Sequence, residues 1–192
     1  LISYGIEILI NISHGQFKSL EFYVSTYSVE GNIGKQTAII FFVTCILGNI
    51  INVIMEEGIF RGLFQKLFEQ KYNFLLSAIL SSLLFGFWHV IAPLRSYYDG
   101  TISFEEMFIN IIILVVTSTL VGFKFSMMTK LTGSLYMSMG DHFVNNTIIN
   151  VLHIVSKDGS IDKLLVMRIS IAQTLSFLII LIYFKLSRNE CS

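Results

Sequence analysis

The sequence predicts an all-α fold, a polytopic transmembrane helical bundle with about five or six spans around a buried polar cavity. Of its 192 residues, 54% are hydrophobic and only 14% are charged, and the mean hydropathy is +0.71. Soluble domains carry roughly 25% charged residues. A domain of this size leaves much of its surface exposed, so it cannot hide several long apolar segments from water. We therefore expect these segments to lie in lipid.

Five segments approach the roughly 20 apolar residues that a helix needs to cross a bilayer. In lipid, every backbone polar group needs a partner within the protein, so segments of this length are expected to be helices. They are residues 37–55, 73–93, 107–128, 133–155 and 164–184.

The ends of the chain are expected to differ from this helical core. Residues 1–13 are apolar and predict either the end of a truncated span or an interfacial helix, and the polar residues 14–36 predict a loop. The expected organisation is an N-terminal segment over 1–36, a helical domain over 37–185 and a polar tail over 186–192. Because the first residues lack a basic start and a small-residue cleavage site, we expect no cleavable signal peptide.

The charged residues predict an orientation in the membrane. The formal net charge is +0, so nothing in the charge points to nucleic acid as a partner. The loops are predicted to fall on two sides of the membrane, and on one of them the cations are diluted by acidic residues. The positive-inside rule makes the other, more basic side cytoplasmic. The cations of that side are Lys66, Lys71, Lys124, Lys130, Lys185 and Arg188.

Two adjacent carboxylates and an arginine, Glu56, Glu57 and Arg61, follow a long apolar run. Ionisable groups at membrane depth usually face a protein interior or a watery cavity. Glu57 and Arg61 are four residues apart in the order that favours an ion pair on a helix. Glu56 is turned about 100° away, so it is expected to face a cavity and to act as a general base. The alternative is that both glutamates are ordinary interfacial charges at a helix end.

Two later motifs, Phe85–His89 and His142–Asn146, are expected at the same depth. If the helix bearing Glu56 continues to a turn near residues 69–72, then Glu56 lies roughly 20 Å from that turn and His89 roughly 25 Å. The fourth span starts on the same side and places His142 and Asn146 roughly 15–20 Å along it. The alternatives are a packing role for His89 and interhelical hydrogen bonds from His142 and Asn146 that only hold the bundle together.

Each of these helices carries a polar stripe, because residues three or four apart share a face. Gly86 would allow close approach of a neighbouring helix. Three inward stripes in one bundle describe a buried polar cavity. The stripes are Asn49, Asn52 and Glu56; Ser81, Phe85 and His89; and Ser138, His142, Asn146 and Asn150.

In these motifs the sequence resembles the CPBP intramembrane proteases, the family of CAAX proteases and bacteriocin-processing enzymes also called the Abi group. The family pattern is Glu-Glu-x-x-x-Arg, then Phe-x-x-x-His, then His-x-x-x-Asn, and it is matched by Glu56-Glu57-x-x-x-Arg61, Phe85-x-x-x-His89 and His142-x-x-x-Asn146. The resemblance covers about residues 37–155. One departure is Asp141, directly before His142, where a small or apolar residue is expected.

The resemblance implies hydrolysis of a peptide bond within the membrane. It implies that Glu56 and His89 activate a water, that Arg61 fixes Glu57, and that an oxyanion is stabilised by His142 and Asn146. Zinc is the alternative activator, with Glu56, His89 and His142 as candidate ligands. No His-Glu-x-x-His helix is present, and we expect a metal-free mechanism without a cofactor.

The resemblance also implies a membrane-associated protein or peptide as substrate. Eukaryotic relatives trim prenylated proteins, whereas bacterial relatives are linked to peptide processing and bacteriocin immunity. A composition rich in Ile, Asn, Phe and Lys is typical of AT-rich bacterial genomes and favours the bacterial cytoplasmic membrane. One alternative is a non-catalytic immunity protein that binds an antimicrobial peptide in the same cavity. Another is an ion-coupled carrier, although the sequence has no inverted repeat.

Overall fold

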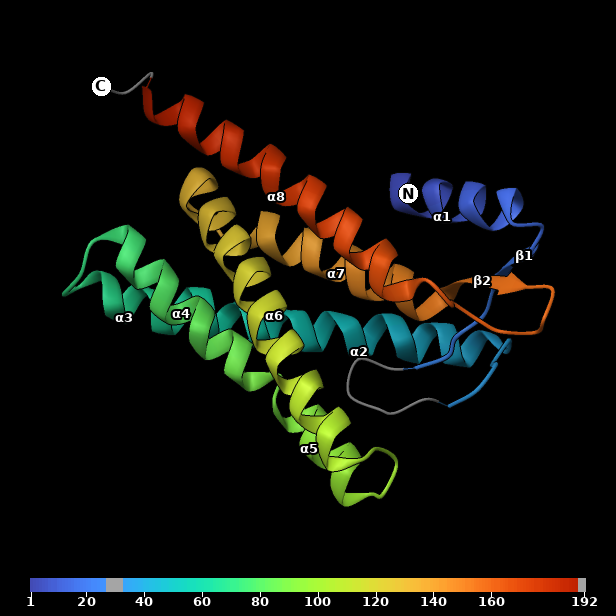
Figure 1. Cartoon of the computed structure of the whole chain (residues 1–192). Helices are drawn as coiled ribbons and strands as arrows, with labels where there is room; N and C mark the ends of the chain where they lie inside the picture. Colours follow the sequence, from blue (N-terminus) through green and yellow to red (C-terminus); the bar gives the residue numbers. More distant parts are fainter. Residues whose placement is uncertain (27–32, 190–192) are drawn as a thin grey trace. The chain divides into compact units, whose positions relative to one another are not determined.

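The computed structural model describes residues 1–26 and 33–189 of the chain. Helices account for most of these residues, and Figure 1 shows their course. The chain divides into two compact units: Leu1–Ile54 with Gly140–Ile179, and Met55–Met139 with Ile180–Ser192. In chain order the elements are α1 (Ile2–Ser13), β1 (Phe17–Phe22), α2 (Ile39–Glu57), η1 (Gly58–Phe64), α3 (Gln65–Glu69), α4 (Phe74–Trp88), α5 (Ile91–Tyr98), α6 (Phe104–Thr132), α7 (Tyr136–Val151), β2 (Leu152–Ser156) and α8 (Leu165–Asn189).

Four helical runs among the described residues are long and apolar enough to cross a membrane: Ile39–Glu69, Phe74–Tyr98, Phe104–Thr132 and Leu165–Ser187. They correspond to four of the five predicted spans, and the expected all-α membrane fold is confirmed. The helix expected over 133–155 is shorter than predicted. It forms α7, which has 16 residues, and the chain then continues as the strand β2. The tail expected from residue 186 begins as helix, because α8 continues to Asn189; residues 190–192 lie outside the described part.

The first unit contains a two-stranded antiparallel sheet that the sequence did not predict. Phe17 pairs with Ser156 and Phe22 with Leu152, so a segment near the start of the chain lies beside the one that follows α7 (Figure 1). The loop expected over 14–36 is therefore wrong where β1 forms, and its residues 27–32 lie outside the described part of the chain. The helix expected over 1–13 is confirmed as α1.

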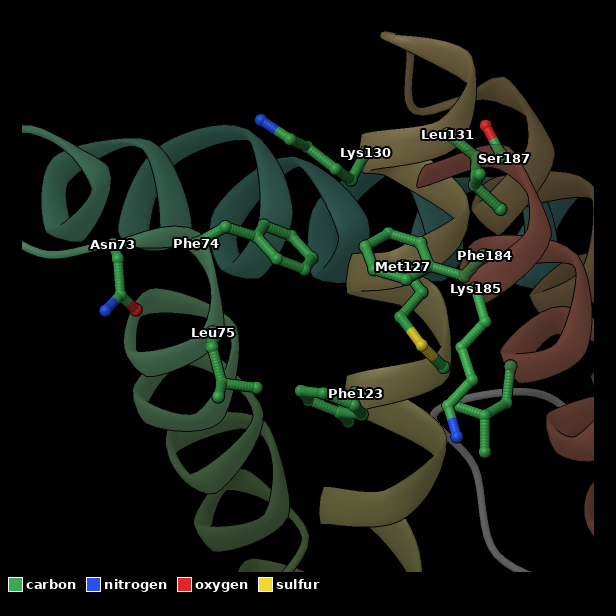
Figure 2. Close-up of a pocket in the computed structure, with 11 residues that line it drawn as sticks. Asn73, Phe74, Leu75, Phe123, Met127, Lys130, Leu131, Phe184, Lys185 and Ser187 are labelled. Carbon is green, nitrogen blue, oxygen red and sulfur yellow. The ribbon is translucent and has the colours of Figure 1, made fainter. Parts of the chain in front are cut away.

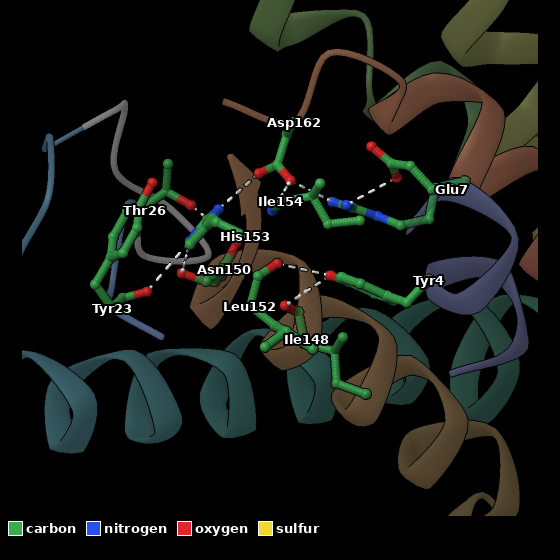
Figure 3. Close-up of polar contacts among 11 residues, drawn as sticks. Tyr4, Glu7, Tyr23, Thr26, Ile148, Asn150, Leu152, His153, Ile154 and Asp162 are labelled. Carbon is green, nitrogen blue, oxygen red and sulfur yellow. Dashed lines mark hydrogen bonds and ion pairs between the residues drawn. The ribbon is translucent and has the colours of Figure 1, made fainter. Parts of the chain in front are cut away.

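A buried charge network holds the first unit together (Figure 3). The Arg168 guanidinium donates to Glu7 Oε2 at 3.0 Å and to Asp162 Oδ1 at 2.9 Å. Asp162 Oδ2 in turn lies 2.6 Å from His153 Nδ1. Arg168 also lies over the Tyr4 ring, 4.1 Å from its centroid. The network thus ties α1, β2 and α8 to the connection that precedes α8.

Both ring nitrogens of His153 face acceptors. Nδ1 faces the Asp162 carboxylate, and Nε2 lies 3.2 Å from the Tyr23 carbonyl and 3.3 Å from that of Asn150. These contacts fix the imidazole between the Asp162 carboxylate and two backbone carbonyls.

In the second unit α4 packs closely against α6. A Cβ atom on Gly86 would meet the Thr119 side chain and come within 2.7 Å of the Val115 carbonyl, so only glycine fits this contact. The helix ends are defined locally: Asn73 Oδ1 accepts the N–H of Leu76 at 3.0 Å, and Gly133 ends α6 with a φ of 66°. Close helix approach at Gly86, expected from the sequence, is confirmed.

One prediction about the charges of the second unit is wrong. Lys124 is expected in a basic connection between spans, but it lies within α6 and is only 1% exposed. Lys66, Lys71 and Lys130 are exposed, as expected for residues at helix ends. A signal for this was present, since Lys124 falls inside the apolar segment predicted over 107–128.

Candidate active site

The helix that carries Glu56 does not end with the apolar run. It continues from α2 through η1 and α3 to Glu69, and a short turn then leads into α4 (Figure 1). Glu56 therefore lies roughly 25 Å from the start of this helix and roughly 20 Å from its end. The expected turn near residues 69–72 is confirmed, and Glu56 is buried, with 6% of its surface exposed.

Glu57 and Arg61 form the ion pair that their spacing predicted. Arg61 Nη1 lies 3.2 Å from Glu57 Oε1, and both side chains are 0% exposed. The guanidinium lies 4.2 Å from the centre of the Phe85 ring and 5.3 Å from that of Phe125. Gly122 leaves the space for this cation, because a Cβ atom there would come within 2.6 Å of Arg61 Nη2. Helices α4 and α6 thus enclose the arginine.

Arg61 sits in a π-helical stretch, η1, in which backbone bonds join residues five apart. The N–H of Gln65 bonds to the carbonyl of Phe60, and the same carbonyl accepts the hydroxyl of Ser81 from α4. Stretches of π-helix are rare and often occur at functional sites. Here the wider turn coincides with the residues that follow the two glutamates.

Glu56 is linked to the stretch that ends in His89. Trp88 Nε1 donates to Glu56 Oε1 at 3.3 Å. His89 Nδ1 lies 2.8 Å from the Phe85 carbonyl, so this nitrogen carries the proton and Nε2 is the nitrogen left to accept one from a ligand. The imidazole also packs against the Phe85 ring, with centroids 4.7 Å apart. Two of the three motifs therefore meet within the second unit.

The third motif belongs to the first unit. His142 and Asn146 lie on α7, with His142 buried and Asn146 partly buried. Next to them, Asn145 Oδ1 accepts Gln173 Nε2 from α8 at 3.0 Å, and Asp141 is partly buried. That His142 and Asn146 share a site with Glu56 stays a prediction.

The same division applies to the proposed zinc ligands. Glu56 and His89 belong to one unit and His142 to the other. Within the described ranges 1–26 and 33–189, no group of three or more His, Cys, Asp or Glu side chains is arranged to hold a metal ion. A zinc site that joins Glu56 and His89 to His142 stays a prediction, and no step below is assigned to a metal.

Sequence reasoning missed three residues of this region. Trp88 is not among the predicted site residues, although its indole N–H donates to Glu56. Gly122 could not be chosen among the glycines of the chain, because its contact with Arg61 arises only when α6 packs on η1. Lys124 Nζ lies 4.9 Å from the centre of the Phe125 ring, and the Arg61 guanidinium lies 5.3 Å from the same ring.

Together the fold and the site define a class of protein. It is an integral membrane protein whose apolar helices bury the Glu57–Arg61 ion pair, with a second carboxylate, Glu56, near the end of α4 that carries His89. A family model for type II CAAX prenyl endopeptidase Rce1-like proteins matches residues 38–148, more than half of the chain. The chain belongs to this family, whose members are CAAX proteases. The comparisons with curated proteins and with solved structures gave no match.

Proposed function

We propose that the chain is an intramembrane endopeptidase that hydrolyses a peptide bond of a membrane-associated protein or peptide. The observation that carries the proposal is the pair of environments at Glu56 and Glu57. Glu57 is fixed by a fully buried Arg61, while Glu56 accepts a hydrogen bond from Trp88 beside His89. Two carboxylates held in different environments are the usual means of separating a structural from a reactive role.

In the proposed reaction Glu56 is the general base. It removes a proton from a water that His89 Nε2 helps to orient, and the water oxygen attacks the carbonyl carbon of the peptide bond. The tetrahedral intermediate then collapses, the C–N bond breaks, and the leaving amine takes the proton from Glu56. The free position of Nε2 supports this role, because Nδ1 is held by the Phe85 carbonyl.

The other motif residues receive supporting roles. Glu57 and Arg61 are positioning residues that fix the helix turn next to Glu56. From the family motif we assign to His142 and Asn146 the stabilisation of the oxyanion, for which two N–H donors are suited. Loss of one such donor typically slows catalysis roughly 10²–10³-fold.

The substrate we propose is a bacterial membrane-associated peptide or protein, processed in the cytoplasmic membrane, with peptide maturation or bacteriocin immunity as the setting. The composition of the chain, rich in Ile, Asn, Phe and Lys, supports a bacterial source. The family match supports a protease that acts on membrane-associated substrates.

The Glu56→Gln variant tests the proposal. The chain is reconstituted in liposomes with a library of lipid-anchored peptides, and cleavage is measured by mass spectrometry. We expect cleavage to fall roughly 10²–10⁴-fold, the usual contribution of a general base. Glu105→Gln, a change at an exposed carboxylate at the start of α6, is the matched control and should cleave like the unmodified chain.

Retained cleavage in Glu56→Gln, with correct membrane insertion, would contradict the role of Glu56. A chain that binds the peptides but cleaves none, and binds equally well as Glu56→Gln, would instead favour the immunity protein that sequesters a peptide.

A metal-free reaction is a separate part of the proposal. We expect activity to survive extended treatment with a zinc chelator, because water activation is assigned to Glu56 and His89 alone. Activity lost on chelation and restored by zinc would replace this assignment with a metal-activated water. Metal content of the purified chain, measured by mass spectrometry, gives an independent readout.

A further inference from the structure

The second unit contains a cavity that the candidate active site does not use (Figure 2). It has a volume of about 810 Å³ and lies where α4 begins, α6 ends and α8 ends. Pockets that hold small organic ligands have volumes of roughly 300–1,000 Å³. The cavity is thus large enough for part of a lipid.

Most of the cavity wall is apolar. The Phe74 and Phe184 rings stack on each other in this wall, with centroids 5.5 Å apart. The buried Met127 and the partly buried Phe123 extend the wall along α6. An apolar wall between the ends of membrane helices suits an acyl chain rather than a polar solute.

Two lysines border the same cavity, and no acidic residue lines it. Lys130 and Lys185 are exposed, and the carboxylate nearest to Lys130, that of Glu69, is already paired with Lys66 at 3.1 Å. Lys130 Nζ lies 5.5 Å from the centre of the Phe74 ring, and in Figure 2 the two amines lie at different edges of the aromatic wall. Exposed cations beside an apolar wall are complementary to an anionic amphiphile.

The positions of Lys130 and Lys185 along their helices also favour an anionic lipid as the ligand. The lysines lie in the last turns of α6 and α8, where long apolar helices end and the headgroup region begins. Basic groups at this level attract the phosphates of anionic lipids.

We propose that this cavity binds a phospholipid with an anionic headgroup. One acyl chain lies along Phe123 and Met127, and the headgroup phosphate contacts the ammonium of Lys130 or Lys185. This site is distinct from the proposed catalytic residues and holds whether or not they cleave peptides.

The test uses the full chain in detergent with equal amounts of phosphatidylglycerol and phosphatidylcholine of the same acyl chains, and counts bound lipids by native mass spectrometry. We expect phosphatidylglycerol to be retained in preference. In the Lys130→Gln/Lys185→Gln variant we expect the ratio of bound phosphatidylglycerol to phosphatidylcholine to fall roughly fivefold for each lysine removed. The control is Lys66→Gln/Lys71→Gln, which removes two exposed lysines that do not line the cavity.

A second variant tests the acyl-chain contact. Leu181→Trp fills the cavity from α8 and should lower retention of phosphatidylglycerol, with circular dichroism confirming an intact helical fold. Three results would overturn the proposal: equal loss in the control variant, displacement of the lipid by excess inorganic phosphate, or unchanged retention in Leu181→Trp. The first would indicate surface charge alone, and the second a free-anion site.

Discussion

The guanidinium of Arg61 is completely enclosed in the candidate active site. It has the Glu57 carboxylate on one side and the Phe85 and Phe125 rings around it. A planar guanidinium can pair with a carboxylate and stack on rings at once, which an ammonium cannot do equally well. The arrangement accounts for an arginine at this position.

Substitutions at Arg61 should therefore separate charge from shape. Removing one partner of a buried ion pair costs roughly 3–5 kcal/mol, so Arg61→Met should be strongly destabilised. Arg61→Lys should lose less, because it keeps the charge but not the stacking. The Glu57→Gln/Arg61→Met double variant should recover part of the loss, since replacing both partners is often nearly neutral. Thermal unfolding in detergent measures these three variants, the Glu57→Gln single variant and the unmodified chain. A double variant as unstable as the sum of Glu57→Gln and Arg61→Met would show that the pair is not coupled.

At the scale of elements, the long helices could be predicted and the strands could not. Four spans were found because their apolar runs are long, and the Glu57–Arg61 pair because it depends only on spacing within one helix. β1 pairs with a strand that follows α7, and no local pattern reveals a partner so distant in sequence. A short apolar run such as 152–156 fits a helix or a strand equally well, which explains why the fourth predicted span was drawn too long.

The contacts of Trp88 with Glu56 and of Gly122 with Arg61 escaped prediction for a related reason. Both depend on which faces of η1, α4 and α6 meet, and therefore on tertiary packing. The π-helical stretch was also invisible, because its residues are ordinary for an apolar helix. Side-chain spacing within a helix is readable from sequence, whereas helix-to-helix contact is not.

Asp162 links the connection between β2 and α8 to the charge network, through its contacts with His153 and Arg168. Burial raises the pKa of Asp162, but hydrogen bonds from His153 and the Ile154 N–H, together with Arg168, outweigh it, and the pKa lies below its ordinary value of 3.8. A carboxylate whose pKa is lower in the folded chain than in the unfolded chain stabilises the fold at pH values above its unfolded pKa. This contribution is lost as the pH falls through the folded pKa. The contribution of Asp162 is therefore present at neutral pH and lost below about pH 4.

We predict that Asp162→Asn lowers the melting temperature at neutral pH, because it leaves Arg168 and His153 without their shared anion. The loss should approach roughly 3–5 kcal/mol. The difference from the unmodified chain should shrink as the pH is lowered below about 4. Glu105→Gln, at an exposed carboxylate at the start of α6, should melt like the unmodified chain at neutral pH. A difference between the Asp162 variant and the unmodified chain that is independent of pH would exclude the charge of Asp162 as the cause.

For the whole molecule, the distribution of charge still predicts an orientation after the correction at Lys124. Lys66 and Lys71 flank the turn between α3 and α4, and Lys130 and Lys185 lie at the ends of α6 and α8. At the other end of α4 and α5, the cation Arg95 is paired with Asp99 at 3.6 Å. Four lysines, Lys18, Lys35, Lys157 and Lys163, are predicted on the opposite side, so the orientation depends on acidic partners rather than on lysine number. Lys35 and Lys163, like Arg95, are paired with carboxylates, and the positive-inside rule then makes the first set of helix ends cytoplasmic.

Cysteine labelling tests this orientation. The run Phe74–Tyr98 has 25 residues and consists of α4 and α5, joined at residues 89–90. The two helices together provide roughly 34 Å, compared with about 30 Å for the hydrocarbon core. The flanking positions of this run, Lys71 and Asp99, should therefore lie on opposite faces. In a background with Cys45→Ser and Cys191→Ser, a membrane-impermeant maleimide should label Asp99→Cys in intact cells, and Lys71→Cys only after the membrane is opened. The opposite pattern would invert the orientation, and labelling of both positions in intact cells would mean that this run does not cross the membrane.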